Sequence, residues 1–255
     1  MNGRNFMNWM FWKKGSQKEK GKSKKQLNYI GKNFSILGDS LSTLQGYNPT
    51  GYNLFYEGEN SNKSGVIQMH DTWWGKVIEH FHGQLLINNS WSGSRVTKIP
   101  SNSQLFPSGC SEERVNGLHI NHIKPDVILV YLGTNDWGYG VEPISSVSHL
   151  EIFESAYTYM LSKLKENYPK AEIWCCTLAS TYMSSSPSFR FPYTYGGLHM
   201  KVYNNLIRKC VNVHQAGLID LYSYSQPYDT IDGSHATADG MNTLAELVIH
   251  SMLYT

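Results

Sequence analysis

Four short polar segments follow one another along this chain, and each carries groups that could take part in acyl transfer. They are residues 38–41 (Gly-Asp-Ser-Leu), 88–93 (Asn-Asn-Ser-Trp-Ser-Gly), 133–136 (Gly-Thr-Asn-Asp) and 232–235 (Asp-Gly-Ser-His). In order they offer a nucleophilic hydroxyl, a backbone donor at a glycine, a side-chain amide donor, and a histidine preceded by a carboxylate. Any one of them alone is equally typical of a turn or a helix cap. All four in this order indicate a serine hydrolase.

The chemistry needs a base, because a serine hydroxyl is a poor nucleophile until its proton is removed during attack. His235 has a carboxylate, Asp232, three residues upstream in a loop that follows a strand-like run. Asp232 could accept a hydrogen bond from one ring nitrogen and leave the other to face Ser40. Backbone N–H groups of Ser40 and Gly93 and the amide of Asn135 could stabilise the oxyanion. The alternatives are a helix start at His235, a plain turn at Gly93 and a loop cap at Asn135.

The four segments resemble the four sequence blocks of the SGNH (GDSL-type) hydrolases, a superfamily of esterases, lipases, thioesterases and carbohydrate deacetylases. This resemblance implies that Ser40 is the nucleophile, His235 the base and Asp232 the residue that orients it. It also implies Ser40, Gly93 and Asn135 as the oxyanion hole. The resemblance covers residues 33–255 and leaves the substrate open.

Strand-like and helix-like runs alternate from residue 33 onward. We expect strands at 33–37, 84–88, 126–132, 172–178 and 217–222, and helices at 72–82, 112–122, 148–167, 199–213 and 238–252. Such alternation predicts an α/β fold, a three-layer flavodoxin-like sandwich with a five-stranded, mostly parallel sheet and helices on both faces. Ligands of such sheets bind beyond the carboxyl ends of the strands. The four polar segments fall there, so the predicted topology agrees with the motif order.

The charge of the chain is distributed unevenly. Residues 1–32 hold nine Lys and Arg and one acidic residue, whereas residues 33–255 hold 13 basic and 19 acidic residues. The lysine-rich part of the tail has almost no apolar surface to bury. We therefore predict a disordered basic extension over 1–32 and one hydrolase domain over 33–255. The extension could aid solubility or contact an anionic surface weakly; no nucleic-acid partner is expected.

Two further observations bear on location and redox state. The apolar stretch 6–12 is too short to span a membrane, precedes the lysines and lacks a small-residue cleavage site, so it does not resemble a signal peptide. We expect a cytoplasmic protein, with an interfacial anchor as the alternative. The spacing of the four cysteines predicts neither disulfides nor a zinc site, and we expect buried thiols at Cys110, Cys175, Cys176 and Cys210.

Two histidine pairs, 80/82 and 119/122, could bind a metal ion, but no third ligand follows either pair at a suitable spacing. Surface or packing roles are the preferred interpretation. The sequence therefore predicts a hydrolase without a metal or another cofactor.

Two aromatic-rich loops, 45–65 and 180–197, should lie at the rim of the site, and Tyr52 and Tyr193 are candidate substrate-binding residues. Aromatic faces among polar neighbours suit a sugar or another polar ester, although simple loop packing explains them equally well. The predicted activity is hydrolysis of short-chain, acetyl-type oxygen esters through an acyl-enzyme. Acyl transfer to a second hydroxyl, a lipase or thioesterase acting on longer chains, and a non-catalytic binding module on the same fold remain alternatives.

Overall fold

One parallel sheet of five strands forms the centre of the computed structural model, which describes residues 28–99, 107–191, 194–195 and 197–254. The strand order is β2-β1-β3-β4-β8, and every neighbouring pair is parallel. This is the doubly wound flavodoxin-like order, in which chain direction across the sheet reverses beside β1. The strands are β1 (Asn33–Gly38), β2 (Gln84–Asn88), β3 (Val127–Tyr131), β4 (Glu172–Cys176) and β8 (Gly217–Ile219).

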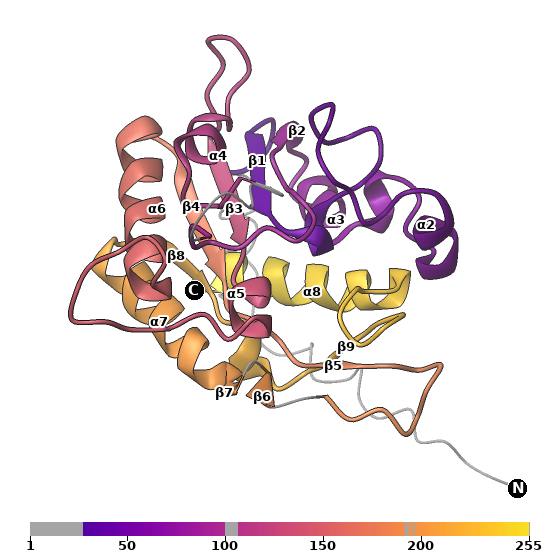
Figure 1. Ribbon diagram of the computed structural model, residues 1–255. Helices are drawn as coiled ribbons and strands as arrows, with labels where there is room; N and C mark the ends of the chain where they lie inside the picture. The colour runs from indigo at the N-terminus through magenta and orange to yellow at the C-terminus, as the bar shows by residue number, and fades with distance from the viewer. Residues whose placement is uncertain (1–27, 100–106, 192–193, 196, 255) are drawn as a thin grey trace, which may run out of the picture.

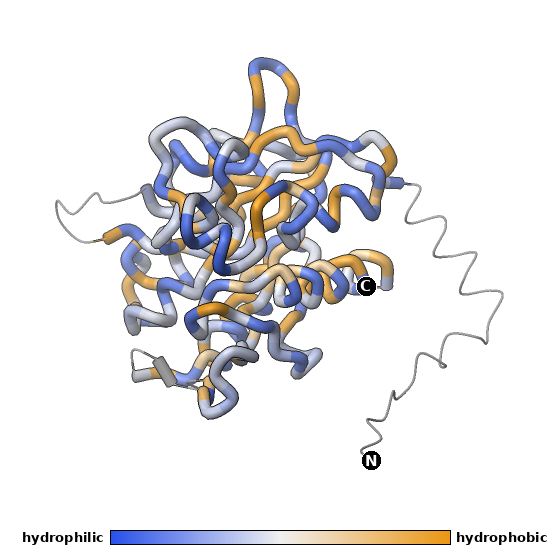
Figure 2. Tube along the Cα trace, turned by 90° about the vertical axis from the view of Figure 1, so that its right-hand side faces the viewer, coloured by the Kyte–Doolittle hydropathy of each residue, from blue (hydrophilic) through white to orange (hydrophobic). Residues whose placement is uncertain are grey.

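Helices cover both faces of the sheet, as the alternating pattern predicts. Helices α3 (Trp73–His80) and α8 (Ala238–Tyr254) pack together, and α6 (Phe153–Asn167) packs on α7 (Met200–Val213) and on α4 (Glu112–Asn116). Figure 1 shows these two groups on opposite sides of the strands. Central strand β3 is buried at all five positions, which explains its uninterrupted apolar sequence. Figure 2 shows hydrophobic stretches in the interior of the tube and along the helix that ends at the C-terminus. The predicted fold class is confirmed.

The ends of three predicted elements need correction. The helix expected over 112–122 ends at Asn116, because Asn89 donates from Nδ2 to the carbonyls of Arg114 and Gly117, at 3.0 and 3.1 Å, and occupies the end of the helix. Residues 118–125 form a loop instead, closed by a bridge between Ile120 and Ile123. The long helix expected from 148 begins at residue 153, and the strand expected to reach 222 ends at 219 and is followed by a 3-10 turn.

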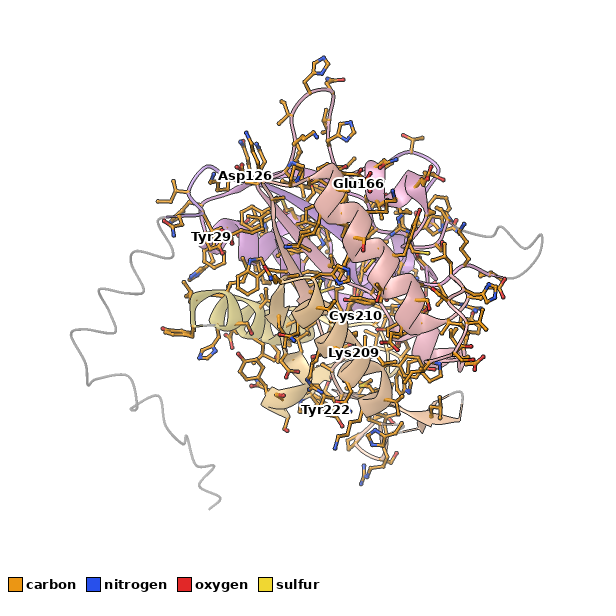
Figure 3. All side chains as sticks on the ribbon, turned by 90° about the vertical axis from the view of Figure 1, so that its left-hand side faces the viewer. Tyr29, Asp126, Glu166, Lys209, Cys210 and Tyr222 are labelled. Carbon is orange, nitrogen blue, oxygen red and sulfur yellow. The ribbon has the colours of Figure 1, made fainter. Side chains whose placement is uncertain are left out.

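The described domain begins before the boundary expected at residue 33. Tyr29 is buried, its ring lies 4.7 Å from that of Phe81, and its hydroxyl donates to Glu172 at 2.7 Å. Lys32 forms an ion pair with Asp126 at 2.9 Å. Figure 3 shows Tyr29 and Asp126 at the same end of the sheet. Residues 1–27 lie outside the described residues, so the disordered extension remains a prediction.

Other features of the described chain concern thiols, metals and membranes. All four cysteines are buried and unbridged, which confirms the expected thiols. The ring of His119 contacts the hydroxyl of Tyr168 at 3.2 Å, a packing contact outside any helix. Within the described ranges, no three His, Cys, Asp or Glu side chains group as metal ligands would. No helix in those ranges has the length and apolar character required to cross a bilayer.

Candidate active site

The turn after β1 presents Ser40 at the carboxyl edge of the sheet. Asp39 caps the 3-10 turn η1 (Ser40–Ser42), and its Oδ1 accepts the backbone N–H of Leu41 at 3.1 Å. Gly38 precedes the turn because a Cβ there would lie 2.6 Å from the hydroxyl oxygen of Ser42. Small residues and the buried cap therefore hold the nucleophile turn close to the strand end.

His235 connects Ser40 to Asp232. Its Nε2 lies 2.9 Å from Ser40 Oγ, and its Nδ1 lies 2.7 Å from Asp232 Oδ2. An ionised carboxylate only accepts hydrogen bonds, so Nδ1 carries the proton and Nε2 is left to accept the serine hydroxyl. The ring of Phe55 stacks on the imidazole, with centroids 3.4 Å apart and planes 8° from parallel. The imidazole is therefore held at both edges and on one face.

The loop between β9 (Tyr228–Asp229) and α8 holds the carboxylate of Asp232 in its ionised form. Its Oδ1 accepts the backbone N–H groups of Ser234 and His235 at 2.9 and 2.8 Å. Burial alone would raise the pKa of Asp232, but the hydrogen bonds from His235 outweigh it and the pKa is lowered. Gly233 turns the loop at φ +89° and its carbonyl accepts the Thr181 hydroxyl at 2.7 Å.

A second loop, after β2, brings Gly93 beside the nucleophile turn. The N–H of Trp91 donates to the Gly38 carbonyl at 3.2 Å, and the N–H of Ser94 donates back to Trp91 at 3.1 Å. Gly93 lies within this turn at φ +81°, the left-handed region that glycine tolerates best. Within the described chain, the backbone N–H groups of Ser40 and Gly93 donate to no protein acceptor. Both N–H groups therefore remain available to a ligand, as the predicted oxyanion hole requires.

Asn135 reaches the same loop from the other side. It belongs to the short helix α5 (Thr134–Gly138), which begins directly after β3 once Gly133 has turned the chain at φ +124°. Its Nδ2 donates to the carbonyl of Ser94 at 2.9 Å. An amide nitrogen carries two protons, so one remains for a ligand. The structure thus brings all the residues of the predicted triad and oxyanion hole to one edge of the sheet.

Asp136 follows Asn135 in the chain, and its buried carboxylate fixes the segment after Gly93. Its carboxylate accepts the backbone N–H groups of Val96 and Thr97 at 2.8 and 3.0 Å and the Thr97 hydroxyl at 2.8 Å. Burial raises the pKa of Asp136, although these three hydrogen bonds act in the opposite direction. The loop that carries Gly93 is therefore tied to the helix that carries Asn135.

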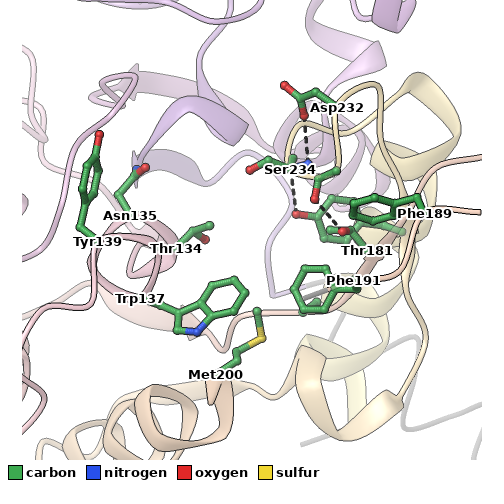
Figure 4. Close-up of a pocket in the computed structure, with 14 residues that line it drawn as sticks. Thr134, Asn135, Trp137, Tyr139, Thr181, Phe189, Phe191, Met200, Asp232 and Ser234 are labelled. Carbon is green, nitrogen blue, oxygen red and sulfur yellow. Dashed lines mark hydrogen bonds between the residues drawn. The ribbon is translucent and has the colours of Figure 1, made fainter. Parts of the chain in front are cut away.

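A cavity of about 370 Å³ opens beside these groups. Figure 4 shows Asn135 and Tyr139 on one side of it and the two phenylalanines of the 180–197 loop on the other. Its lining includes Asn135, Trp137, Phe189, Phe191, Met200 and Asp232. Sequence reasoning placed the two phenylalanines at the rim but missed Trp137, Tyr139 and Met200. Trp137 lies only two residues beyond Asn135, and that proximity was the available signal.

The two tyrosines singled out as substrate-binding residues have different outcomes. The Tyr52 ring packs on Trp91 with centroids 4.2 Å apart, and Tyr52 is not among the residues that line the cavity. Tyr193 lies outside the described residues. A role in substrate binding remains a prediction for both.

Serine, histidine and aspartate joined in series at the carboxyl edge of a parallel sheet form the arrangement that hydrolases use for acyl transfer. A family model described as GDSL-like lipase/acylhydrolase matches residues 32–187, and the chain belongs to this family. The multidomain esterase of Ruminococcus flavefaciens is 26% identical over 154 residues, which are 60% of this chain. The match spans only 18% of that esterase.

Solved structures share the fold. A protein from Bacteroides ovatus, named as a GDSL-like lipase, is 26% identical and superposes with a TM-score of 0.69, covering 88% of this chain and 99% of its own. A family 2 carbohydrate esterase with a carbohydrate-binding domain, from Corynascus thermopiles (Myceliophthora fergusii), superposes with a TM-score of 0.57 at 17% identity. This second likeness covers 88% of this chain and 66% of that one, and concerns the fold alone.

Proposed function

We propose that this protein is a serine esterase that hydrolyses short-chain, acetyl-type oxygen esters through an acyl-enzyme intermediate. The observation that carries the proposal is the position of the His235 ring, 2.9 Å from the hydroxyl of Ser40 and 2.7 Å from the carboxylate of Asp232. Membership of an acylhydrolase family supports the same reaction class.

In the first half of the reaction, Ser40 Oγ attacks the ester carbonyl carbon while its proton passes to Nε2 of His235. The carbonyl oxygen becomes an anion that accepts hydrogen bonds from the N–H groups of Ser40 and Gly93 and from the amide of Asn135. When the tetrahedral intermediate collapses, the carbon–oxygen bond to the alcohol breaks. The imidazolium then gives its proton to the leaving alkoxide, and the acyl group stays on Ser40.

In the second half, water attacks the acyl-enzyme and gives a proton to His235. Collapse of the second tetrahedral intermediate releases the carboxylic acid, and the proton returns to Ser40 Oγ. Asp232 stays ionised throughout and stabilises the imidazolium formed in each half. The lowered pKa of Asp232 supports this role, because the carboxylate then remains charged over the working range of a histidine base.

The substrate is a short acyl group on a polar alcohol, and a sugar is the preferred class. The cavity of about 370 Å³ is of the size typical of small-molecule sites and combines aromatic rings with hydroxyl and amide groups. A second hollow shares Thr181, Phe189, Phe191 and Met200 with it and continues past Tyr222. An extended polar leaving group could occupy both. We keep a cytoplasmic location as part of the proposal, to be tested by cell fractionation.

Substitution of the nucleophile tests the activity. Ser40→Ala should abolish turnover of p-nitrophenyl acetate and labelling by a fluorophosphonate probe, because no other group supplies the attacking oxygen. Ser162→Ala is a matched control: Ser162 Oγ lies 3.0 Å from His214 Nε2, but the other ring nitrogen faces the carbonyl of Cys210 rather than a carboxylate. Turnover by Ser40→Ala comparable to that of Ser162→Ala would refute the proposal.

Acyl-chain length tests the substrate class. We expect kcat/KM to be highest for acyl groups of about two to four carbons, because each further methylene gains only about 0.8 kcal/mol and needs an apolar wall to gain it. The measurement is a series of p-nitrophenyl esters from acetate to octanoate, together with acetylated sugars. A wide margin in favour of octanoate would contradict the short-chain proposal and point to a lipase-like site.

A further inference from the structure

Arg114 is an unusual residue for its location. It lies in the short helix α4, its side chain is 0% exposed, and no ion pair joins it to a carboxylate within the described ranges. A buried cation is costly unless hydrogen bonds and nearby opposite charge compensate for lost hydration, and the buried carboxylate of Asp39 acts favourably on the charge of Arg114. None of the four motif segments contains it.

Every N–H of its guanidinium is used. Nε donates to the carbonyl of Asn89 at 3.2 Å, and Nη2 donates to the same carbonyl at 2.9 Å. The second proton of Nη2 reaches the Gly38 carbonyl at 2.8 Å. Nη1 donates to Ser94 Oγ at 2.8 Å and to the carbonyl of Pro107 at 3.1 Å. These five hydrogen bonds match the five N–H groups of a guanidinium.

Four of the five hydrogen bonds end on the two segments that carry the proposed backbone oxyanion donors, and the fifth ends on Pro107. Gly38 lies two residues before Ser40, and Asn89 and Ser94 stand on either side of Gly93 in the loop after β2. We propose that Arg114 is a positioning residue: its planar guanidinium holds the nucleophile turn and the Gly93 loop in the spacing that an oxyanion requires. This inference rests on the proposed esterase function and extends it to a residue outside the motifs.

The charge of Arg114 acts in the same direction as its geometry. Burial lowers its pKa to about 10, so the guanidinium stays cationic at neutral pH. A fixed cation behind the donors favours negative charge on the carbonyl oxygen. Lysine cannot replace it, because an ammonium has three donors and lacks the planar fork that joins three carbonyls and a hydroxyl.

The test compares Arg114→Ala and Arg114→Lys with wild type on p-nitrophenyl acetate. Because Arg114 bonds to the segments that carry the donors and does not line the cavity, kcat should fall about 100-fold or more for Ala, as when one oxyanion donor is lost, and KM should stay unchanged. Arg114→Lys should be intermediate, because it retains the charge but loses the fork. Arg208→Ala is the control: Arg208 also bonds through its guanidinium, twice to Asp220, and lines neither hollow, so melting temperature should fall while kcat stays at the wild-type value.

A milder variant keeps the inference testable if both substitutions of Arg114 prevent folding. Ser94→Ala removes one acceptor of the guanidinium and leaves Arg114 in place, so kcat should fall at unchanged KM. A wild-type kcat in a folded Arg114→Ala, Arg114→Lys or Ser94→Ala variant would overturn the inference. A higher KM at unchanged kcat would also overturn it. The proposed function fails separately, through an inactive wild type or an active Ser40→Ala variant.

Discussion

Asp39 makes stability depend on pH in a way that one substitution can isolate. The residue is 3% exposed, one carboxylate oxygen accepts the N–H of Leu41 at 3.1 Å, and the other has no hydrogen-bond partner within the described chain. Burial raises the pKa of Asp39 to about 6. Asp39→Asn keeps the shape and the oxygen that caps the turn and removes the charge.

The magnitude follows from the difference between folded and unfolded pKa. An unfolded aspartate has a pKa of 3.8, about two units below the folded value, and each unit corresponds to about 1.4 kcal/mol. Because the folded pKa is raised, the folded state retains its proton longer as pH increases. Between about pH 4 and pH 6 the wild type therefore loses on the order of 3 kcal/mol of unfolding free energy, and Asp39→Asn does not.

The assay is urea unfolding of both proteins from pH 4 to pH 8, with the difference in unfolding free energy plotted against pH. The unfolding free energy of Asp39→Asn relative to wild type should increase from about pH 4 to about pH 6 and stay constant above that. Titrations common to both proteins cancel in this difference. Asp126→Asn supplies the opposite sign at lower pH: burial would raise the pKa of Asp126, but the Asn33 N–H and Lys32 outweigh it and lower the pKa. The wild type should therefore gain stability relative to Asp126→Asn as pH rises toward about 4, and for this pair the measurement extends below pH 4. A flat difference for Asp39→Asn would refute the reasoning.

Two further predictions concern the oxyanion hole and the tail. Asn135→Ala should lower kcat for p-nitrophenyl acetate by about 100- to 1,000-fold at little change in KM, because it removes one donor to the oxyanion. Asn167→Ala, at the last residue of α6, is the control. A kcat for Asn135→Ala within a few-fold of wild type would remove Asn135 from the oxyanion hole. Removal of residues 1–27 should leave the melting temperature unchanged, whereas removal of 1–30 should lower it in differential scanning fluorimetry, because the second cut deletes the buried ring of Tyr29 and its bond to Glu172. A drop already at the first cut would show that the tail docks on the domain.

The strands and the motif residues could be predicted from the sequence because their signals are local. Strand β3 lies in an uninterrupted apolar run that stops before Gly133, and Asn135 follows two residues after that glycine. Ser40 likewise follows β1 closely, and Asp232 lies only three residues before His235. Once the alternation implied a parallel sheet, the carboxyl ends of the strands had to meet along one edge. No knowledge of side-chain contacts was needed.

The cavity and the end of α4 could not be predicted, because both depend on contacts distant in sequence. Met200 and Phe191 belong to the cavity only because the start of α7 and the 180–197 loop converge on α5. The helix expected over 112–122 had suitable residues but ends early, since Asn89 occupies the carbonyl of Gly117. Local propensity cannot anticipate a partner that lies 28 residues away.

The residues proposed to react lie in short local motifs, whereas the residues that position them are distant in sequence. Phe55 stacks on His235 from 180 residues upstream, and Arg114 bonds to Gly38 across 76 residues. Each contacts a motif residue whose local sequence would allow several orientations. Oxyanion stabilisation depends on donors that are fixed in place before the charge develops. The four motifs therefore account for which atoms take part in the proposed reaction. The rate depends also on buried residues that carry no motif, and substitutions there should change kcat while leaving every motif residue in place.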